Sequence, residues 1–103
     1  MDAKQLLARI EKLPEEWRHP KAVVVCHALA NNIVGRFMSD EDAVAIALDL
    51  HLRHIAEKLA ERGWMIYLGA ERWNVCDDTD DFVLNRNTYV EAAISAAEEC
   101  NKQ

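Results

Sequence analysis

Apolar side chains recur at helical spacing in the first third of the chain. Within residues 3–13 the leucine and isoleucine side chains share one helical face, and Asp2 and Gln5 have the spacing of a capping box. Pro20 suits the first turn of a second helix. The apolar side expected for that helix consists of Ala22, Cys26, Leu29, Ala30, Ile33 and Phe37. The pattern favours a helix over the alternative, a buried strand at 22–26.

A longer helical pattern follows Ser39, a good N-cap that precedes three acidic residues in the turn where the helix dipole favours them. We expect this third helix to run from Asp40 to Arg62 and to stop at Gly63, because glycine best tolerates a left-handed C-terminal cap. Its main apolar stripe consists of Val44, Leu48, Leu52, Ile55 and Leu59. We expect this stripe to pack against the core.

The hydrophobic period changes after Gly63 from that of a helix to that of a strand. Apolar alternation at 64–68, a four-residue loop at 69–72 and a second apolar run at 73–76 predict a β-hairpin. Residues 82–84 supply a candidate third strand.

A last helix is expected to begin near Thr88, whose spacing to Glu91 is that of a capping box. Its expected inner face consists of Tyr89, Ala93, Ala96 and Cys100. The order of elements predicts an α+β fold with three N-terminal helices, a β-hairpin or a short three-stranded antiparallel sheet, and a C-terminal helix. A chain of 103 residues, 50% hydrophobic and 29% charged, fits a single domain spanning 1–103.

Two apolar surfaces exceed what the predicted core obviously covers. On the third helix, Ile46 and Leu50 are displaced from the main stripe toward the polar side. On the hairpin, Met65 and Tyr67 point away from the face that the two tryptophans occupy. We expect these surfaces to bind another protein or to form a homodimer.

The net charge of −6 lies mostly in the last third of the chain, since residues 1–70 carry −1 and residues 71–103 carry −5. A chain of this sign repels phosphate backbones, which argues against direct nucleic-acid binding. The acidity is densest in one loop, at Asp77, Asp78, Asp80 and Asp81. This loop lacks the glycine and glutamate of a calcium-binding EF-hand. It is either a solvated turn or an electronegative contact for a partner with a basic surface.

The sequence also indicates a compartment. The N-terminal residues do not form a secretory signal, and the longest apolar run, 22–26, is far too short to span a membrane. Cys26, Cys76 and Cys100 form no CxxC pair and are expected to be buried thiols, which suits a reducing environment. We therefore expect a cytoplasmic protein that binds no membrane.

His51 and His54 lie three residues apart on the predicted third helix, where such a pair could contribute two ligands to a metal. A structural zinc site needs four ligands, and the chain offers no second pair at ligand spacing. His51 also falls inside the apolar stripe, which is typical of a hydrogen-bonded core or interface histidine. We expect no metal and no cofactor. The alternative is a small-molecule- or metal-binding domain, or an accessory enzyme subunit, centred on the two histidines.

The sequence contains no recognisable catalytic motif. The three glycines are too dispersed for a phosphate-binding loop. Ser39 is placed as a helix cap and Ser95 on a helix surface, and cysteines on buried elements are inert. We therefore expect that the protein is not an enzyme.

Residues 62–99 combine a Gly-Trp strand, a tight loop, a Trp-Asn-Val strand, an acidic turn and an alanine-rich terminal helix. This segment resembles the hairpin-plus-helix endings of small bacteriophage and prophage accessory proteins, some of which are anti-CRISPR or other anti-defence inhibitors. The resemblance implies a phage setting and carries over no functional residue. Together with the charge pattern, it leads to the hypothesis of an inhibitor that binds the basic surface of a host nucleic-acid-handling complex.

Overall fold

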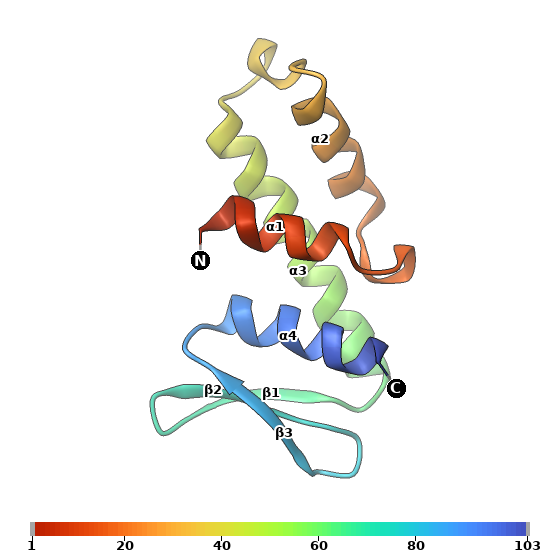
Figure 1. Ribbon diagram of the computed structural model, residues 1–103, viewed down its shortest axis with the longest axis vertical. Coiled ribbons are helices and arrows are strands. Elements are labelled where there is room, and N and C mark those ends of the chain that lie inside the picture. The colour runs from red at the N-terminus through yellow and green to blue at the C-terminus, as the bar shows by residue number, and fades with distance from the viewer. Residues whose placement is uncertain (1, 103) are drawn as a thin grey trace. The chain divides into compact units, whose positions relative to one another are not determined.

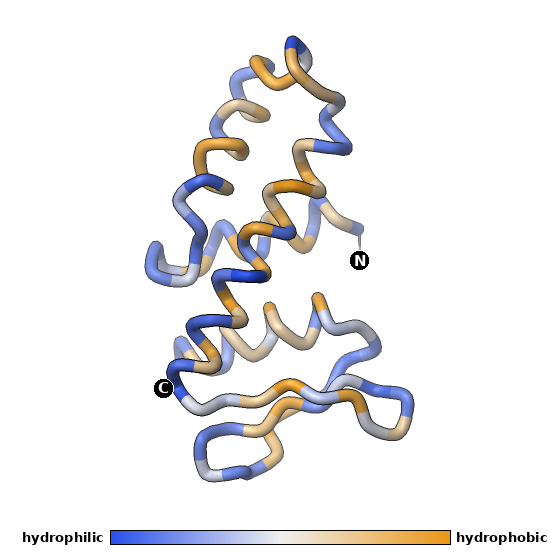
Figure 2. Tube along the Cα trace, turned by 180° about the vertical axis from the view of Figure 1, so that it is seen from behind, coloured by the Kyte–Doolittle hydropathy of each residue, from blue (hydrophilic) through white to orange (hydrophobic). Residues whose placement is uncertain are grey.

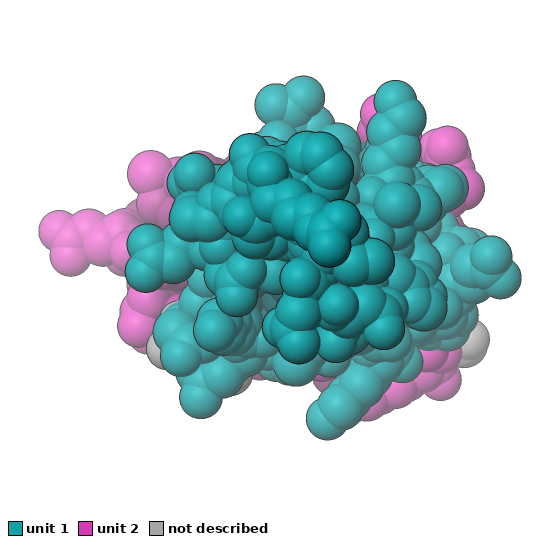
Figure 3. Space-filling model, turned by 90° about the horizontal axis from the view of Figure 1, so that it is seen from above, with its two compact units in different colours: residues 1–54 teal, residues 55–103 magenta. Residues whose placement is uncertain are grey.

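The computed structural model describes residues 2–102 of the chain. The chain divides into two compact units, residues 1–54 and residues 55–103 (Figure 3). The described residues form four α-helices, two short 3₁₀-helices and one three-stranded antiparallel sheet (Figure 1). This confirms the expected α+β class with three helices before the sheet and one after it. The expectation of a single domain stays a prediction.

The first unit is helical. Its elements are α1 (Ala3–Glu11), η1 (Glu15–Trp17), α2 (Pro20–Ala30), η2 (Val34–Arg36) and the first part of α3 (Asp40–Glu61). The capping box of α1 is confirmed, because the Asp2 carboxylate accepts from the Gln5 backbone N–H at 2.9 Å and the Gln5 side chain accepts from the Asp2 N–H at 2.9 Å. The cap of α2 is His19, whose Nδ1 accepts from the Lys21 N–H at 3.0 Å.

A small hydrophobic core joins α1, α2 and α3 within this unit. Its buried members are Leu7, Ala22, Val44 and Ala47, and the half-buried residues packed against them are Val25, Cys26, Leu29 and Leu50. Small side chains at several of these positions allow the helices to approach closely. The core therefore rests on helix-to-helix packing of the kind that the apolar periodicity predicted.

The helix α2 ends earlier than its apolar pattern suggested. It confirms the helical interpretation of residues 22–26, but it stops at Ala30, and Asn32 adopts a left-handed conformation with φ +57°. Asparagine tolerates this conformation better than most residues and so ends the helix. As a result, Ile33 and Phe37 are 48% and 79% exposed, and their expected place on the buried side was wrong.

The helix α3 starts in the first unit and ends in the second. Its N-cap is confirmed, since the Ser39 hydroxyl oxygen accepts from the Asp42 N–H at 3.1 Å. Gly63 follows the helix with φ +78°, and a Cβ added there would lie 3.1 Å from the Cβ of Asp78. Both the backbone conformation and the close approach therefore require glycine. Of the expected stripe, Val44, Ile55 and Leu59 are buried, whereas Leu48 and Leu52 are half-buried.

The second unit contains the sheet, in the order β1 (Met65–Gly69), β2 (Arg72–Cys76) and β3 (Phe82–Arg86), followed by α4 (Tyr89–Asn101). Figure 1 shows α4 lying over one face of the sheet, and α4 contacts all three strands. The Thr88 hydroxyl caps α4 by accepting from the Glu91 N–H at 3.2 Å. The third strand, one of two alternatives in the sequence, is therefore present.

The connection between β1 and β2 is shorter than expected. Gly69 pairs with Arg72, so only Ala70 and Glu71 form the turn, with φ +53° and +67°. Two left-handed residues are the signature of a two-residue hairpin turn, which usually takes Asn-Gly. The predicted four-residue loop was wrong because neither alanine nor glutamate is typical of a two-residue hairpin turn.

The helix α4 is buried more widely than its predicted inner face. Ala93 and Ala96 are buried as expected, whereas Tyr89 is 36% exposed and Cys100 is half-buried. The other buried residues of α4 are Ala92, Ile94, Ser95 and Ala97. Ser95 was expected on the helix surface, and this was wrong because its turn of the helix is buried on more than one side.

Candidate functional site

One face of the sheet turns away from α4. Side chains at paired positions of neighbouring strands lie on the same face, and those on successive positions alternate. Trp73, on the covered face, places its ring 5.3 Å from that of Tyr89 in an edge-to-face arrangement. The opposite face carries Met65, Tyr67, Arg72, Asn74, Cys76, Phe82 and Asn85, and we call the part of it formed by Met65, Tyr67, Asn74, Cys76 and Phe82 the open sheet face.

The open sheet face is largely apolar and accessible. Met65 is 56% exposed, Tyr67 43% and Phe82 61%. The outward positions of Met65 and Tyr67 follow the sequence alternation. Phe82 was not recognised from the sequence, because a register shift between Val75 and Cys76 sets which face β3 presents there. Three large apolar side chains on one accessible face are the pattern of a binding surface.

Tyr67 and Cys76 interact across the open sheet face. The Cys76 thiol donates a hydrogen bond to the Tyr67 hydroxyl oxygen, with a sulfur-to-oxygen distance of 3.8 Å. This contact raises the pKa of Tyr67, so the hydroxyl stays protonated at neutral pH. The Tyr67 hydroxyl therefore adds no charge to this side of the sheet, whereas the exposed Arg72 guanidinium does.

The acidic loop joins β2 to β3 as an ordered turn (Figure 2, the hydrophilic turn at the lower left). Asp77 organises it, because its Oδ1 accepts from the Thr79 hydroxyl at 2.7 Å, the Thr79 N–H at 2.9 Å and the Asp81 N–H at 3.1 Å. The hydroxyl bond is the largest cause that holds the pKa of Asp77 below its usual value. Asp81 also accepts from Thr79, at 3.2 Å.

The four aspartates of the turn are therefore not equivalent. The carboxylates of Asp77 and Asp81 accept hydrogen bonds within the turn. Asp78 and Asp80 are exposed, and their carboxylates take part in no hydrogen bond or ion pair with the rest of residues 2–102. These two charges are the ones that a partner could neutralise. They follow Cys76 and precede Phe82, so they flank one end of the open sheet face.

Ile46 and Leu50 do not form one outward surface on α3. Ile46 is 42% exposed, as expected. Leu50 is half-buried and packs against the core of the first unit. Leu50 therefore contributes to the helical core, and of this pair Ile46 is the exposed residue.

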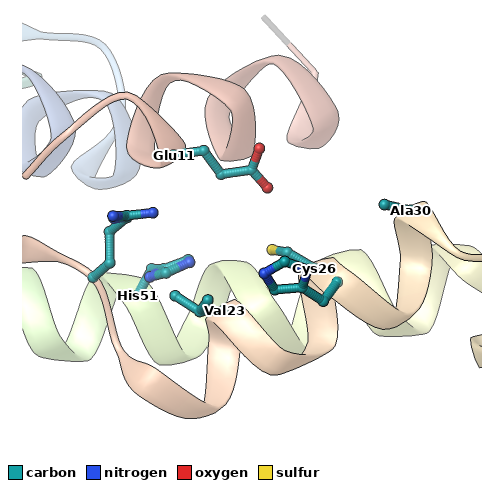
Figure 4. Close-up of a pocket in the computed structure, with 7 residues that line it drawn as sticks. Glu11, Val23, Cys26, Ala30 and His51 are labelled. Atoms are coloured by element: carbon teal, nitrogen blue, oxygen red, sulfur yellow. The ribbon is translucent and has the colours of Figure 1, made fainter. Parts of the chain in front are cut away.

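A separate pocket of about 310 Å³ lies within the first unit. It is lined by Glu11, Arg18, Val23, Cys26, His27, Ala30 and His51. Figure 4 shows Glu11, Cys26 and His51 converging on it from α1, α2 and α3. Sequence reasoning singled out only His51, because nothing in the spacing of the other residues brings them together.

His51 forms the buried wall of this pocket. It is fully buried, and its Nδ1 accepts from the backbone N–H of His19 at 3.1 Å. Burial lowers the pKa of His51 to about 4, and the nearby positive charge of Arg18 adds to this against the opposing effect of Glu11. The ring is therefore neutral at neutral pH. This fits the expected hydrogen-bonded core histidine.

His54 belongs to a different environment. Its Nε2 lies 2.8 Å from the Glu16 carbonyl oxygen, and its ring packs edge-on against His19 with centroids 5.8 Å apart. His54 does not line the pocket that His51 lines. Between residues 2 and 102, no group of three or more histidine, cysteine, aspartate or glutamate side chains is arranged to hold a metal.

The cysteines form no disulfide within the described part of the chain, and each is half-buried rather than fully buried as expected. Burial raises the pKa of Cys26 to about 12, and the adjacent Glu11 carboxylate adds to the shift as hydrogen-bond acceptor and as negative charge. A thiol with this pKa stays protonated at neutral pH and is a poor nucleophile.

None of the helices between residues 2 and 102 has both the length and the apolar character that crossing a membrane requires. The chain matches no known family model, no curated protein and no solved structure.

Proposed function

We propose that the chain is a non-catalytic protein-binding module that docks through the open sheet face onto a protein with a basic surface. The observation that carries this proposal is the exposure of Met65, Tyr67 and Phe82 on one face of the sheet. Methionine and aromatic side chains are enriched at the centres of protein interfaces. Covering them removes apolar surface from water without requiring the fold to change.

Charge supports a basic partner. The second unit has ten acidic and five basic residues, and the exposed carboxylates of Asp78 and Asp80 flank the open sheet face. Such a rim attracts a positively charged surface, speeds association and disfavours acidic partners. A surface that normally holds nucleic acid has the required charge. With the resemblance of residues 62–99 to phage accessory proteins, the finer form of the proposal is a phage-encoded inhibitor that competes with phosphate on a host nucleic-acid-handling complex.

The proposal that the protein acts by binding alone rests on how its reactive side chains are used. Ser39 caps α3 through its hydroxyl. The Cys26 thiol, with its pKa raised to about 12, is protonated. His51 uses Nδ1 to accept a backbone hydrogen bond, so it cannot take a proton from a nucleophile at that nitrogen.

The test is capture from a bacterial lysate with matched variants, read by mass spectrometry. Phe82→Glu and Met65→Glu place a charge on the open sheet face. Leu68→Glu is the control, because Leu68 is 60% exposed on the same strand as Met65 but alternates to the other face. Circular dichroism first establishes that all three variants keep the fold.

The proposal expects a protein with a basic surface that the wild type and Leu68→Glu retain and that the two open-face variants lose. The release of this partner should increase as the salt concentration rises, because salt screens the attraction between exposed charges. Equal capture by all four proteins would refute docking at this face. Light scattering of the purified chain tests whether a second copy of the chain occupies the open sheet face. A homodimer that Phe82→Glu dissociates would assign the face to that second copy.

A further inference from the structure

The pocket of the first unit contains a buried donor with no acceptor. Because Nδ1 of His51 accepts the His19 N–H, the proton of the neutral ring is on Nε2. That nitrogen is buried and has no hydrogen-bond partner within residues 2–102. Buried polar groups are nearly always paired with a hydrogen-bond partner. A side chain that is fully buried at a pocket wall with its donor unused indicates a site for an acceptor.

A second hydrogen-bond donor of the same pocket is also buried and has no acceptor. The Nε of Arg18 is buried and unpartnered among the described residues, and Arg18 lines the pocket beside His51. The charge of Arg18 lowers the pKa of His51, although burial is the larger cause. Two N–H donors, one of them on a cation, suit a carboxylate, which offers two acceptor oxygens and a compensating charge.

The other side of the pocket is acidic. Glu11 lines it from the end of α1, and its charge reaches both Cys26 and His51. A simple carboxylate would be repelled by Glu11, whereas a molecule that also carries an ammonium group would be attracted. Val23 and Ala30 add an apolar part to the wall. The volume, about 310 Å³, is at the lower end of the range for small-molecule sites.

We infer that this pocket binds a small zwitterion of the α-amino-acid type. Its carboxylate accepts from Arg18 Nε–H and His51 Nε2–H, its ammonium group pairs with Glu11, and its side chain lies against Val23 and Ala30. This site lies entirely in the first unit and does not depend on the open sheet face.

The test uses three probes of similar shape: leucine, which has both charged groups, isocaproate, which lacks the ammonium group, and isoamylamine, which lacks the carboxylate. Each is titrated to millimolar concentrations into the isotope-labelled full chain and followed by NMR. Leucine should shift the signals of the His51 ring and the Cys26 amide saturably. Each singly charged probe should bind about tenfold more weakly, because it loses one charge-assisted hydrogen-bonded contact.

Two variants separate a real site from general charge effects. Glu11→Gln should weaken leucine binding and strengthen isocaproate binding, whereas Glu15→Gln, which removes an exposed charge from η1, should change neither. Arg18→Met should weaken both carboxylates about tenfold, and Arg36→Met is its matched control. Glu11→Gln keeps the test valid if Arg18→Met disturbs the fold.

The inference is overturned if none of the three probes produces saturable shifts at His51 and Cys26. It is equally overturned if leucine and isocaproate bind alike to the wild type and to Glu11→Gln, since the pocket would then not recognise a zwitterion. Binding that both control variants weaken as much as the site variants would show adventitious charge attraction only.

Discussion

The two units of the chain use their polar side chains in opposite ways. The first unit has a net charge of −1 and buries His51 in the wall of a pocket with an unused donor. The second has a net charge of −5, places its densest charges on an ordered turn and leaves apolar side chains exposed beside them. We therefore propose an internal binding site in the first unit and an external one in the second. The contrast teaches that charge and apolar patterning point to the external site, while only the fold reveals the internal one.

Matched truncations of the core should have the largest effect and test how far the two units are separate. Ile10 in the first unit and Ile94 in the second are both fully buried. Replacing either with alanine should lower the free energy of unfolding by about 2–5 kcal/mol. Because α3 runs through both units, we expect calorimetry to show one transition that both variants shift. Two transitions, each moved by only one variant, would contradict the single-domain prediction.

Acid should destabilise the chain through His51, and all four histidines lie in the first unit. The pKa of His51 is lowered from 6.5 to about 4, so the unfolded chain takes up the proton first as the pH falls. Stability should therefore drop between pH 6.5 and about 4, by at most about 3 kcal/mol. Denaturant unfolding at several pH values measures this change.

The matched comparison for this pH effect is His51→Gln against His27→Gln, whose side chain is exposed. His51→Gln should flatten the pH dependence of the stability, and His27→Gln should leave it unchanged. In the second unit, the lowered pKa of Asp77 gives stability that is present above the ordinary aspartate pKa of 3.8 and is lost only at lower pH. A wild type whose stability is constant from pH 6.5 to 4 would show that His51 is not held neutral by the fold.

Substitution with glutamate should change the free energy of unfolding by different amounts at Leu50 and at Ile46. Leu50→Glu puts a charge at the edge of the helical core and should lower the free energy of unfolding by about 2 kcal/mol. Ile46→Glu should change it by less than about 0.5 kcal/mol, because Ile46 is exposed. If light scattering shows that Ile46→Glu dissociates a dimer, the outer side of α3 is the interface. Equal loss of stability in both variants would contradict the placement of Leu50.

The elements that local chemistry specifies were predictable from the sequence. The capping box at Asp2, the cap at Ser39 and the stop at Gly63 each depend on one or two nearby residues, and all three are present. The alternation along β1 correctly placed Met65 and Tyr67 outward. Two of the three large apolar residues of the open sheet face were therefore predictable from periodicity alone.

The remaining features depend on contacts between segments far apart in sequence. Arg18 and Glu11 meet His51 only because three helices pack together, and no spacing rule links them. The exposure of Phe82 follows from a register shift in the sheet, which sequence alternation does not show. The different uses of Asp77 and Asp78 likewise follow from hydrogen bonds within the turn rather than from residue type.

Substitutions in the turn between β1 and β2 should have the smallest effect on stability, and that effect should be an increase. Ala70 and Glu71 both adopt left-handed conformations that cost free energy for residues with a Cβ. Replacing them with Asn-Gly should raise the stability of the second unit by about 1 kcal/mol, measured by thermal unfolding. Reversing the order to Gly-Asn serves as a comparison. A loss of stability with Asn-Gly would argue against the two-residue turn.

The most direct test of docking at the open sheet face is the affinity of the captured partner for purified variants, measured by calorimetry at low and high salt. Phe82→Ala should weaken binding by about tenfold or more, because an aromatic side chain at the centre of an interface contributes strongly. Leu68→Ala should leave the affinity unchanged, and Asp78→Asn with Asp80→Asn should reduce its salt dependence. Equal affinities for the wild type, Phe82→Ala and the double aspartate variant would contradict the account.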